Sequence, residues 1–224
     1  GSGMTVNGDA KVSHSEFKFG DGSASFDGNG DYLSIADSPD FDLGNGDFTL
    51  DTWVRFNDVA REQVIAEKFI GGQNGYTLYL GGGLLFFYVD NVVVIQSSTR
   101  FSANTWYHVA AVRDGSNFDL YVNGKRERNQ TSAITVSNQP SPFRIGSSNG
   151  TSSYLNGQVD EFRLSKGIAR WTSDFTPPAQ EYSAAVPAGG ASDSYTKLLL
   201  HFNGYQYEES VPEKIYDANG KLIR

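Results

Sequence analysis

Strict alternation of side-chain type is the feature that most constrains how this chain can fold. In residues 47–56, apolar side chains occupy every second position except Thr52, and the positions between them carry Thr, Asp, Trp and Arg. Residues 106–113 repeat the alternation. A period of two is that of a β-strand, whose successive side chains point to opposite faces of a sheet. Continuous apolar runs at residues 84–89 and 92–95 indicate further strands, covered on both faces.

Turn signals separate these strands at short intervals. Asp90-Asn91, Asp114-Gly115 and Asn123-Gly124 each fit the two-residue turn of a β-hairpin. The 25 glycines show no collagen periodicity and are typical of a chain with many tight turns. The one candidate for a helix is a short turn around residues 165–171. Many short strands with almost no helix indicate an all-β antiparallel sandwich or barrel.

Length, charge and cysteine content exclude several classes of protein. The 224 residues suit one large β-sandwich, and 38% hydrophobic residues are enough to bury a core. The formal net charge of −8 argues against nucleic acid as a partner and suits a calcium ion. Because cysteine is absent, disulfides and zinc–thiolate sites are excluded. No apolar run is long enough to span a membrane.

Composition divides the chain into four parts. Residues 1–4, Gly-Ser-Gly-Met, are typical of a cloning remnant. The sandwich is expected over residues 5–182. Residues 183–195, rich in Ala, Gly and Ser, indicate a linker, and residues 196–224 contain a strand-like run followed by a tail.

Five sequence blocks follow one another in a characteristic order: Ser23–Ile35, Phe48–Arg55, Thr105–Arg113, Leu120–Lys125 and Gly157–Leu164. In this order they resemble the laminin-G-like domains of the concanavalin A-like lectin and glucanase group, found in bacterial surface and phage structural proteins. The resemblance covers residues 20–182. It implies a two-sheet antiparallel jelly-roll sandwich, here with a C-terminal linker and an appended strand. It also implies an extracellular, cell-surface or virion location.

One departure from the family pattern concerns the segment Leu198–Gly204, Leu-Leu-Leu-His-Phe-Asn-Gly. Domains of this type usually open with such a strand, but here it follows the linker. Either it begins a following repeat, or it supplies the missing strand of this domain, in cis or exchanged with another copy. An isolated apolar strand would invite aggregation, so we expect residues 196–202 to dock beside residues 159–164. Exchange between copies would make residues 196–202 a self-association site.

An acidic loop is a candidate calcium site. Asp27, Asn29 and Asp31 place oxygen-bearing side chains at alternate positions, with glycines between them that permit a tight loop. The resemblance implies that an aspartate on the last strand, Asp160, completes a structural Ca²⁺ site. The alternative is that residues 27–31 form only a hairpin turn, because Asn-Gly is a favoured turn pair.

Glycan sites combine an aromatic ring with planar hydrogen-bonding groups. Trp53 and Arg55 share one face of a predicted strand with Asp51, and Tyr79 and Trp171 lie on or near predicted loops. For any single aromatic residue, packing in the core or at a sheet edge is the alternative. The predicted ligand-binding residues are Trp53, Arg55, Tyr76, Tyr88, Asn91 and Tyr154.

The sequence contains no recognisable catalytic arrangement. Retaining glycosidases need two carboxyl groups about 5 Å apart, which acidic residues at alternate positions of a strand would provide. The nearest pair, Asp160 and Glu161, is adjacent, so its side chains are expected on opposite faces. The chain is therefore predicted not to be an enzyme.

These patterns predict a non-catalytic carbohydrate- or surface-binding module of a larger extracellular or virion protein, whose partner is a glycan or a surface protein. The alternative is a purely structural or interaction repeat, as in an adhesin or a phage structural protein. A polysaccharide-active enzyme is the third hypothesis.

Overall fold

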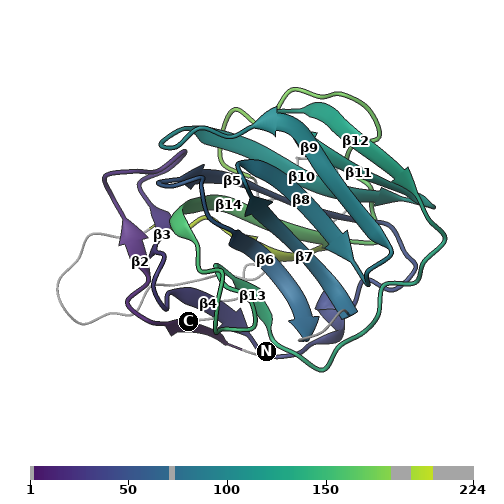
Figure 1. The fold of residues 1–224 in the computed structure, drawn as a ribbon, viewed down its shortest axis with the longest axis horizontal. Coiled ribbons are helices and arrows are strands. Elements are labelled where there is room, and N and C mark those ends of the chain that lie inside the picture. The colour runs from purple at the N-terminus through teal and green to yellow at the C-terminus, as the bar shows by residue number, and fades with distance from the viewer. Residues whose placement is uncertain (1–2, 71–73, 183–192, 204–224) are drawn as a thin grey trace.

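The chain forms two antiparallel β-sheets packed face to face (Figure 1). The computed structural model describes residues 3–70, 74–182 and 193–203. Within them, the seven-stranded sheet, called sheet A, has the order β1-β4-β13-β6-β7-β8-β9. Its strands are β1 (Met4–Asn7), β4 (Tyr32–Ile35), β6 (Gln63–Ile70), β7 (Asn74–Gly81), β8 (Leu84–Val89), β9 (Val93–Arg100) and β13 (Phe143–Ile145).

The second sheet, sheet B, has the order β12-β11-β10-β5-β14-β3-β2, and β15 also pairs with β14. The two sheets make a jelly-roll sandwich, as predicted, and the chain crosses between them at β1–β2, β3–β4, β4–β5, β5–β6, β9–β10, β12–β13 and β13–β14. The strands of sheet B are β2 (Lys11–Ser13), β3 (Ser23–Asp27), β5 (Phe48–Phe56), β10 (Trp106–Asp114), β11 (Asn117–Val122), β12 (Lys125–Thr131), β14 (Asn156–Lys166) and β15 (Thr196–Leu200).

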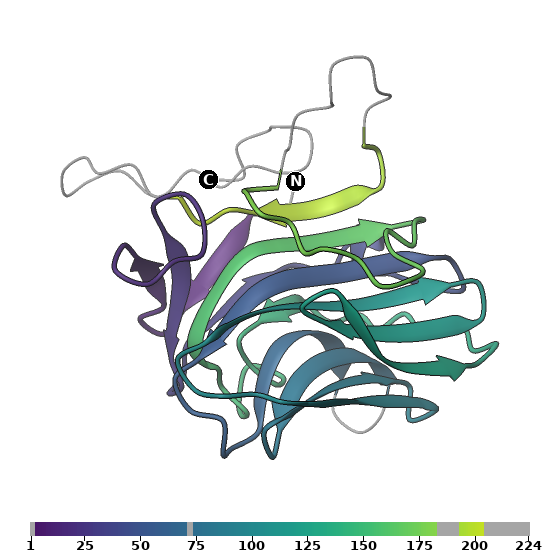
Figure 2. The same cartoon turned by 90° about the horizontal axis from the view of Figure 1, so that it is seen from above.

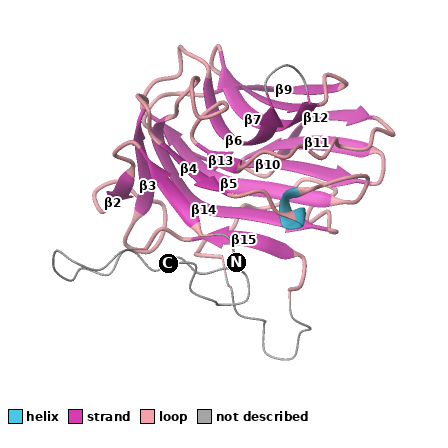
Figure 3. Cartoon of the chain, turned by 90° about the horizontal axis from the view of Figure 1, so that it is seen from below, coloured by secondary structure: helices cyan, strands magenta, loops and turns pink. Residues whose placement is uncertain are grey.

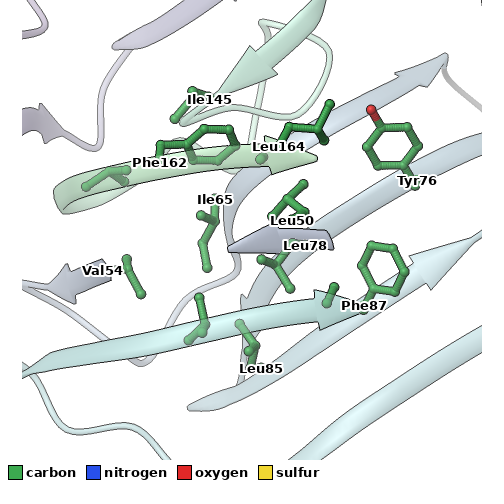
Figure 4. Close-up of a cluster of buried hydrophobic side chains, with 14 of the residues drawn as sticks. Leu50, Val54, Ile65, Tyr76, Leu78, Leu85, Phe87, Ile145, Phe162 and Leu164 are labelled. Atoms are coloured by element: carbon green, nitrogen blue, oxygen red, sulfur yellow. The ribbon is translucent and has the colours of Figure 1, made fainter. Parts of the chain in front are cut away.

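The core lies between the two sheets and is filled by alternate side chains of most of the strands. Leu50 and Val54 of β5 face Leu78 of β7 and Phe87 of β8, and each of the four is at most 1% exposed (Figure 4). Phe162 of β14 belongs to the same cluster. The alternation in residues 47–56 therefore marks the inward face of β5, although the outward side chains of this strand are covered as well, apart from the partly exposed Arg55.

Hairpins form at all three predicted turns, but their bounds differ at two of them. After β10 the turn is Gly115-Ser116, because Asp114 still pairs with Asn117, and the β8–β9 loop has three residues, 90–92. Asp90 and Asn91 adopt φ values of 48° and 58° between β8 and β9. Asn123 and Gly124 adopt 49° and 77° between β11 and β12. Two successive positive φ angles twist a two-residue loop to match its strands, and Asn, Asp and Gly tolerate this conformation best.

Residues 165–171, the one candidate for a helix, are not helical. Instead, β14 continues to Lys166, because Ser165 and Lys166 pair with Thr49 and Phe48 of β5. Sheet pairing over a long sequence distance overrides the weak local preference for a turn. Among the described residues, the one helical element is the 3₁₀ turn η1 (Pro39–Phe41).

The appended strand β15 docks on the sandwich as predicted. It pairs antiparallel with the second half of β14, with Leu200 opposite Phe162 and Leu198 opposite Leu164 (Figure 2). The first half of β14 pairs on the same side with β3. Leu198, Leu200 and Phe202 are buried in the common core. One edge of β14 is thus completed by two separate segments of the chain.

The strand β12 lies beside β9, the edge strand of sheet A (Figure 3), and its side chains contact that strand. Glu127 accepts hydrogen bonds from the backbone nitrogens of Ser98 and Thr99, both at 2.8 Å. Gln130 bonds the backbone at both Val92 and Val94. These contacts satisfy backbone groups that an open edge strand would present to other chains.

Only some of the segment boundaries expected from composition fall within the described residues. Met4 belongs to β1, where it pairs with Ile35 and is buried, so this residue is integrated into the sheet. Of the predicted linker, residues 183–192 lie outside the described residues, as does the tail at 204–224. None of the helices in the described part of the chain is long and apolar enough to cross a membrane.

Candidate functional site

Two predicted ligand-binding residues, Trp53 and Arg55, lie on the outer face of sheet B, and this face is covered. Trp53 is 7% exposed: the Phe19 ring meets it edge-on at 5.8 Å, and Lys18 Nζ lies 4.1 Å from its ring centre. Arg55 Nη1 donates to Gln158 Oε1 at 2.9 Å. Contacts within the chain therefore already occupy both groups.

The segment 167–182 covers the next part of the same face. Trp171 and Phe175 stack on each other at 4.0 Å, and both rings meet His108 edge-on. His108 Nε2 in turn lies 2.9 Å from the Tyr182 hydroxyl. Trp171, a further sequence candidate, thus packs against the sheet.

A buried ion pair lies beneath this segment. Arg163 donates two hydrogen bonds of 3.0 Å to the carboxylate of Asp51, which has no exposed surface. Burial by itself would raise the pKa of Asp51, but Arg163 and His108 outweigh it and lower the pKa to about 2. This pair has a structural role and leaves no charge available to a ligand.

Tyr76 was predicted as a ligand contact, and the structure corrects this. It is 1% exposed, and its hydroxyl donates to the backbone oxygen of Phe41 at 3.0 Å. The register of β7 directs Tyr76, Leu78 and Leu80 into the core, so the outward residues are Thr77 and Tyr79. Each face of β7 carries a tyrosine, and the sequence did not show which of the two faces points into the core.

An aromatic surface lies on the outer face of sheet A. Tyr79 and Phe86 stand on neighbouring strands with their rings parallel, 5.0 Å apart at 10°. Tyr88 meets Phe69 edge-on at 5.9 Å. We call this partly exposed surface the outer aromatic face, consisting of Phe69, Thr77, Tyr79, Phe86 and Tyr88.

The outer aromatic face corrects a second expectation. The continuous apolar run of β8 indicated a strand covered on both faces, but only Leu85, Phe87 and Val89 are buried. Phe86 and Tyr88 are partly exposed on the opposite side. Tyr88 was among the predicted residues, whereas Phe69 and Phe86 were missed, because an apolar run does not show which face is covered.

Polar side chains continue across sheet A from the outer aromatic face. The strand register places Arg144 of β13, Glu67 of β6, Thr77 of β7 and Tyr88 of β8 in one row, with Val94 of β9 at its end. Thr77 Oγ1 is buried and, among the described residues, has no hydrogen-bond partner. The partly exposed group of the row is therefore the Tyr88 ring, while Thr77 Oγ1 and Glu67 lie beneath the surface.

Glu67 is buried at one end of this row. It is 1% exposed, and its Oε1 accepts from the Asn149 backbone at 2.6 Å and lies 3.4 Å from Arg144 Nη1. Burial raises the pKa of Glu67 to about 7, against the lowering effect of both partners. The loop that carries Asn149 covers this end of sheet A.

The remaining predicted ligand residues flank sheet A. Asn91 is in the β8–β9 turn, where its backbone hydrogen-bonds the Tyr88 side chain. Tyr154 lies in the β13–β14 connection, with its ring 6.5 Å from Tyr32 of β4 and its hydroxyl bonded to the Gly150 oxygen. Asn91 thus adjoins the outer aromatic face, and Tyr154 lies on the side of β4.

Three carboxylates gather beside the β3–β4 turn. Oxygen atoms of Asp9, Asp27 and Asp31 lie within 4.8 Å of one another. Asp31 is buried, which raises its pKa, and it accepts from the backbone nitrogens of Asp9 and Asp27. The exposed Asn29 donates its backbone N–H to Asp27. Asp9 was missed because it lies in the β1–β2 turn, remote in sequence from the acidic loop.

Asp160 does not belong to this group of carboxylates. Its side chain accepts hydrogen bonds from the backbone nitrogens of Lys18, Phe19 and Glu161, at 2.8, 3.0 and 2.8 Å. Burial raises the pKa of Asp160 to about 7. It sits where the partner of β14 changes from β3 to β15, so its carboxylate satisfies backbone groups at that break.

Comparison with known proteins places this fold in a family. Residues 27–171 match the family model described as the concanavalin A-like lectin/glucanases superfamily. The chain belongs to this superfamily. The match covers the strands that carry the outer aromatic face and most of the sandwich. No curated protein sequence matches the chain.

Several solved structures share the fold of this superfamily member. A Bacteroides ovatus protein, provisionally named as carbohydrate binding, is 16% identical, with a TM-score of 0.61 over 99% of this chain and 57% of its own. Domain 4 of AbnA, an extracellular arabinanase from Geobacillus stearothermophilus solved with arabinotriose, is 16% identical, with a TM-score of 0.58 over 74% of this chain and 82% of its own.

A third similar structure is the ligand binding domain of botulinum neurotoxin serotype D, solved with N-acetylneuraminic acid. It is 13% identical, with a TM-score of 0.57 over 75% of this chain and 43% of its own. The present chain thus spans about half the length of the Bacteroides and toxin chains. At these identities the likeness concerns the fold.

Proposed function

We propose that this chain is a non-catalytic module that binds neutral glycans through the outer aromatic face, as part of an extracellular, cell-surface or virion protein. The observation that carries the proposal is the outer aromatic face, where the parallel rings of Tyr79 and Phe86 lie partly exposed beside Tyr88. Sugars are bound by aromatic surfaces together with a few well-placed polar groups. The Bacteroides ovatus protein named for carbohydrate binding and the arabinanase domain solved with arabinotriose support this ligand class.

The charges near this surface favour a neutral sugar over an acidic one. Arg144, the basic side chain in the described row, already pairs with Glu67. The chain as a whole carries a formal charge of −8. An anionic sugar such as a sialic acid would therefore meet an unfavourable potential without a free cation to pair with.

Replacing Tyr79 or Phe86 with Ala will weaken glycan binding at least about tenfold, or about 1.4 kcal/mol, because each removes half of the stacked pair. The measurement is a glycan array followed by titration calorimetry with arabino-oligosaccharides and other neutral glycans. Trp106→Ala is the matched control, since Trp106 is a partly exposed aromatic residue on the outer face of sheet B. Equal losses in all three variants would contradict the proposal, and no binding by the parent would favour a structural repeat.

Turnover of polysaccharides is not expected. The adjacent acidic residues Asp160 and Glu161 are both fully buried, where Asp160 bonds backbone nitrogens and Glu161 bonds Tyr182 N and His201 Nδ1. Neither is placed to flank a glycosidic bond. Reducing ends and unsaturated products should stay at background in long incubations. Product formation that is lost on mutating one acidic residue would show an enzyme.

We further propose that Ca²⁺ binds the carboxylates of Asp9, Asp27 and Asp31. The supporting observation is their mutual distance of 4.8 Å or less, since calcium prefers carboxylate and carbonyl oxygens. Calcium at a hundred times its dissociation constant should stabilise the fold by about 2.7 kcal/mol. Melting curves in millimolar calcium and in excess chelator measure the difference.

Two variants distinguish the proposed ligands of this calcium site. Asp9→Ala should abolish the calcium response, because Asp9 is exposed and contributes one of the three carboxylates. Asp160→Ala should lower the melting temperature but retain the response, because Asp160 bonds backbone nitrogens elsewhere. The opposite pattern would restore Asp160 as the ligand and remove Asp9.

A further inference from the structure

One buried lysine is surrounded by oxygen atoms from three separate segments. Lys68 of β6 is 2% exposed, and its Nζ lies 2.7 Å from Asp37 Oδ1 and 2.8 Å from Asp42 Oδ1. The same nitrogen lies 3.2 Å from Asn138 Oδ1 and 2.6 Å from the backbone oxygen of Gln139. We call these four oxygens the Lys68 cage.

The Lys68 cage has the composition of a metal site. Two carboxylates, a side-chain amide oxygen and a backbone carbonyl are the ligand types that calcium takes in proteins. An ammonium group has three hydrogens to donate, one fewer than the oxygens that Lys68 meets. The four oxygens therefore surround a positive charge, and their number exceeds the three acceptors that the ammonium hydrogens can use.

Contacts that do not involve Lys68 hold the cage segments in place. Phe41, next to Asp42, stacks on Phe143 at 4.9 Å and accepts the Tyr76 hydroxyl bond at 3.0 Å. A backbone bridge joins Gly44 to Val136, with the Val136 nitrogen 2.8 Å from the Gly44 oxygen. The loops that carry Asp37, Asp42, Asn138 and Gln139 are thus anchored on both sides of the cage.

We propose that Asp37, Asp42, Asn138 and Gln139 form a cation site that the chain fills with its own lysine ammonium. Removal of the ammonium leaves four oxygens with two negative charges, which suits one divalent cation of the Ca²⁺ type with water as further ligands. In the parent, Lys68 fixes this end of the sandwich without a metal. The site is separate from the Asp9, Asp27 and Asp31 carboxylates and independent of glycan binding.

The test is a melting comparison of the full chain in an Asp9→Ala background, which removes the other proposed calcium site. Asp9→Ala/Lys68→Ala should melt well below Asp9→Ala in chelator, because two carboxylates lose their cation. Saturating calcium should then raise the melting temperature of the double variant by about 5 °C or more. Asp9→Ala alone should not respond to calcium.

Two further variants make the result specific. Adding Asp42→Ala to the double variant should abolish the calcium response. Lys125→Ala, which breaks an exposed lysine–aspartate pair of similar length, 2.9 Å, should neither destabilise the chain strongly nor create a calcium response. The proposal is overturned if the double variant gains nothing from calcium, if Asp42→Ala leaves the gain intact, or if the double variant stays unfolded in both buffers.

Discussion

Removal of residues 193–224 will destabilise the sandwich severely and leave a protein that aggregates. The deletion takes away β15, whose Leu198 and Leu200, with the following Phe202, are buried in the core. Burial of each such side chain stabilises the fold by about 1.5–3 kcal/mol, so their loss approaches the whole stability of a typical domain. The deletion also exposes the second half of the β14 edge. Solubility, melting temperature and size-exclusion profile are the measurements.

Point substitutions within β15 test the same contact without a deletion. Leu200→Ala should cost about 2–5 kcal/mol, as in other fully buried positions. Lys197→Ala is the control, because Lys197 is half-buried on the same strand and should cost under about 1 kcal/mol. A truncated protein as soluble and heat-resistant as the parent would assign the segment to a following repeat. A parent dimer that becomes monomeric on truncation would show that the strand is exchanged between copies.

Raising the pH from 5 to 8 will lower the free energy of unfolding by about 3–5 kcal/mol. Burial raises the pKa of Glu67 from an ordinary 4.5 to about 7, and that of Asp160 from 3.8 to about 7. Above the unfolded pKa the unfolded chain has lost these protons while the folded chain still binds them. Stability therefore falls as pH rises towards 7, by about 1.4 kcal/mol per unit for each group.

Two further titrating groups, His201 and Asp51, affect how the free energy of unfolding depends on pH. The pKa of His201 is raised by its contact with Glu161, against the lowering effect of burial, so its contribution is also lost as pH rises. Asp51 acts in the opposite direction: its pKa of about 2 means that its stabilisation is lost only as pH falls below about 4. Maximum stability is therefore expected near pH 4–5.

Denaturant unfolding at a series of pH values measures this profile, and Glu67→Gln assigns the share of Glu67. Gln keeps an acceptor for the Asn149 backbone but does not titrate, so the slope between pH 5 and 8 should fall by about half. Glu62→Gln is the control, because Glu62 is exposed just before β6 and this variant should leave the slope unchanged. A parent whose stability is constant across this range would contradict the expectation.

How far the sequence predicted the fold can be argued from particular strands. The alternation in β5 and β10 and the turn pairs Asp90-Asn91 and Asn123-Gly124 gave the strands and hairpins correctly. Both signals are local, since side-chain direction and positive φ depend on a few neighbouring residues. The docking of β15 beside β14 was also predicted, from the resemblance and from the apolar character of Leu198–Leu200.

The candidate site was predicted less well, because it depends on which face of each sheet is covered. In β7, Tyr76 and Tyr79 are both aromatic, and only packing of the two sheets decides that Tyr76 points inward. Trp53 was assigned to an open face, but residues 18–19 and 167–182 cover it. Cover of this kind comes from segments more than 30 residues distant, which periodicity does not record.

The sequence by itself determined that this chain is an antiparallel β-sandwich with a further strand at its C-terminal side, because period-two patterning and turn chemistry act within a few residues. The tertiary structure alone decided which charges meet. It brings Asp9 to Asp27 and Asp31, moves Asp160 to the break in the β14 edge, and closes the Lys68 cage from three segments. Such groupings depend on sheet order and register, which set distances between residues that are remote along the chain.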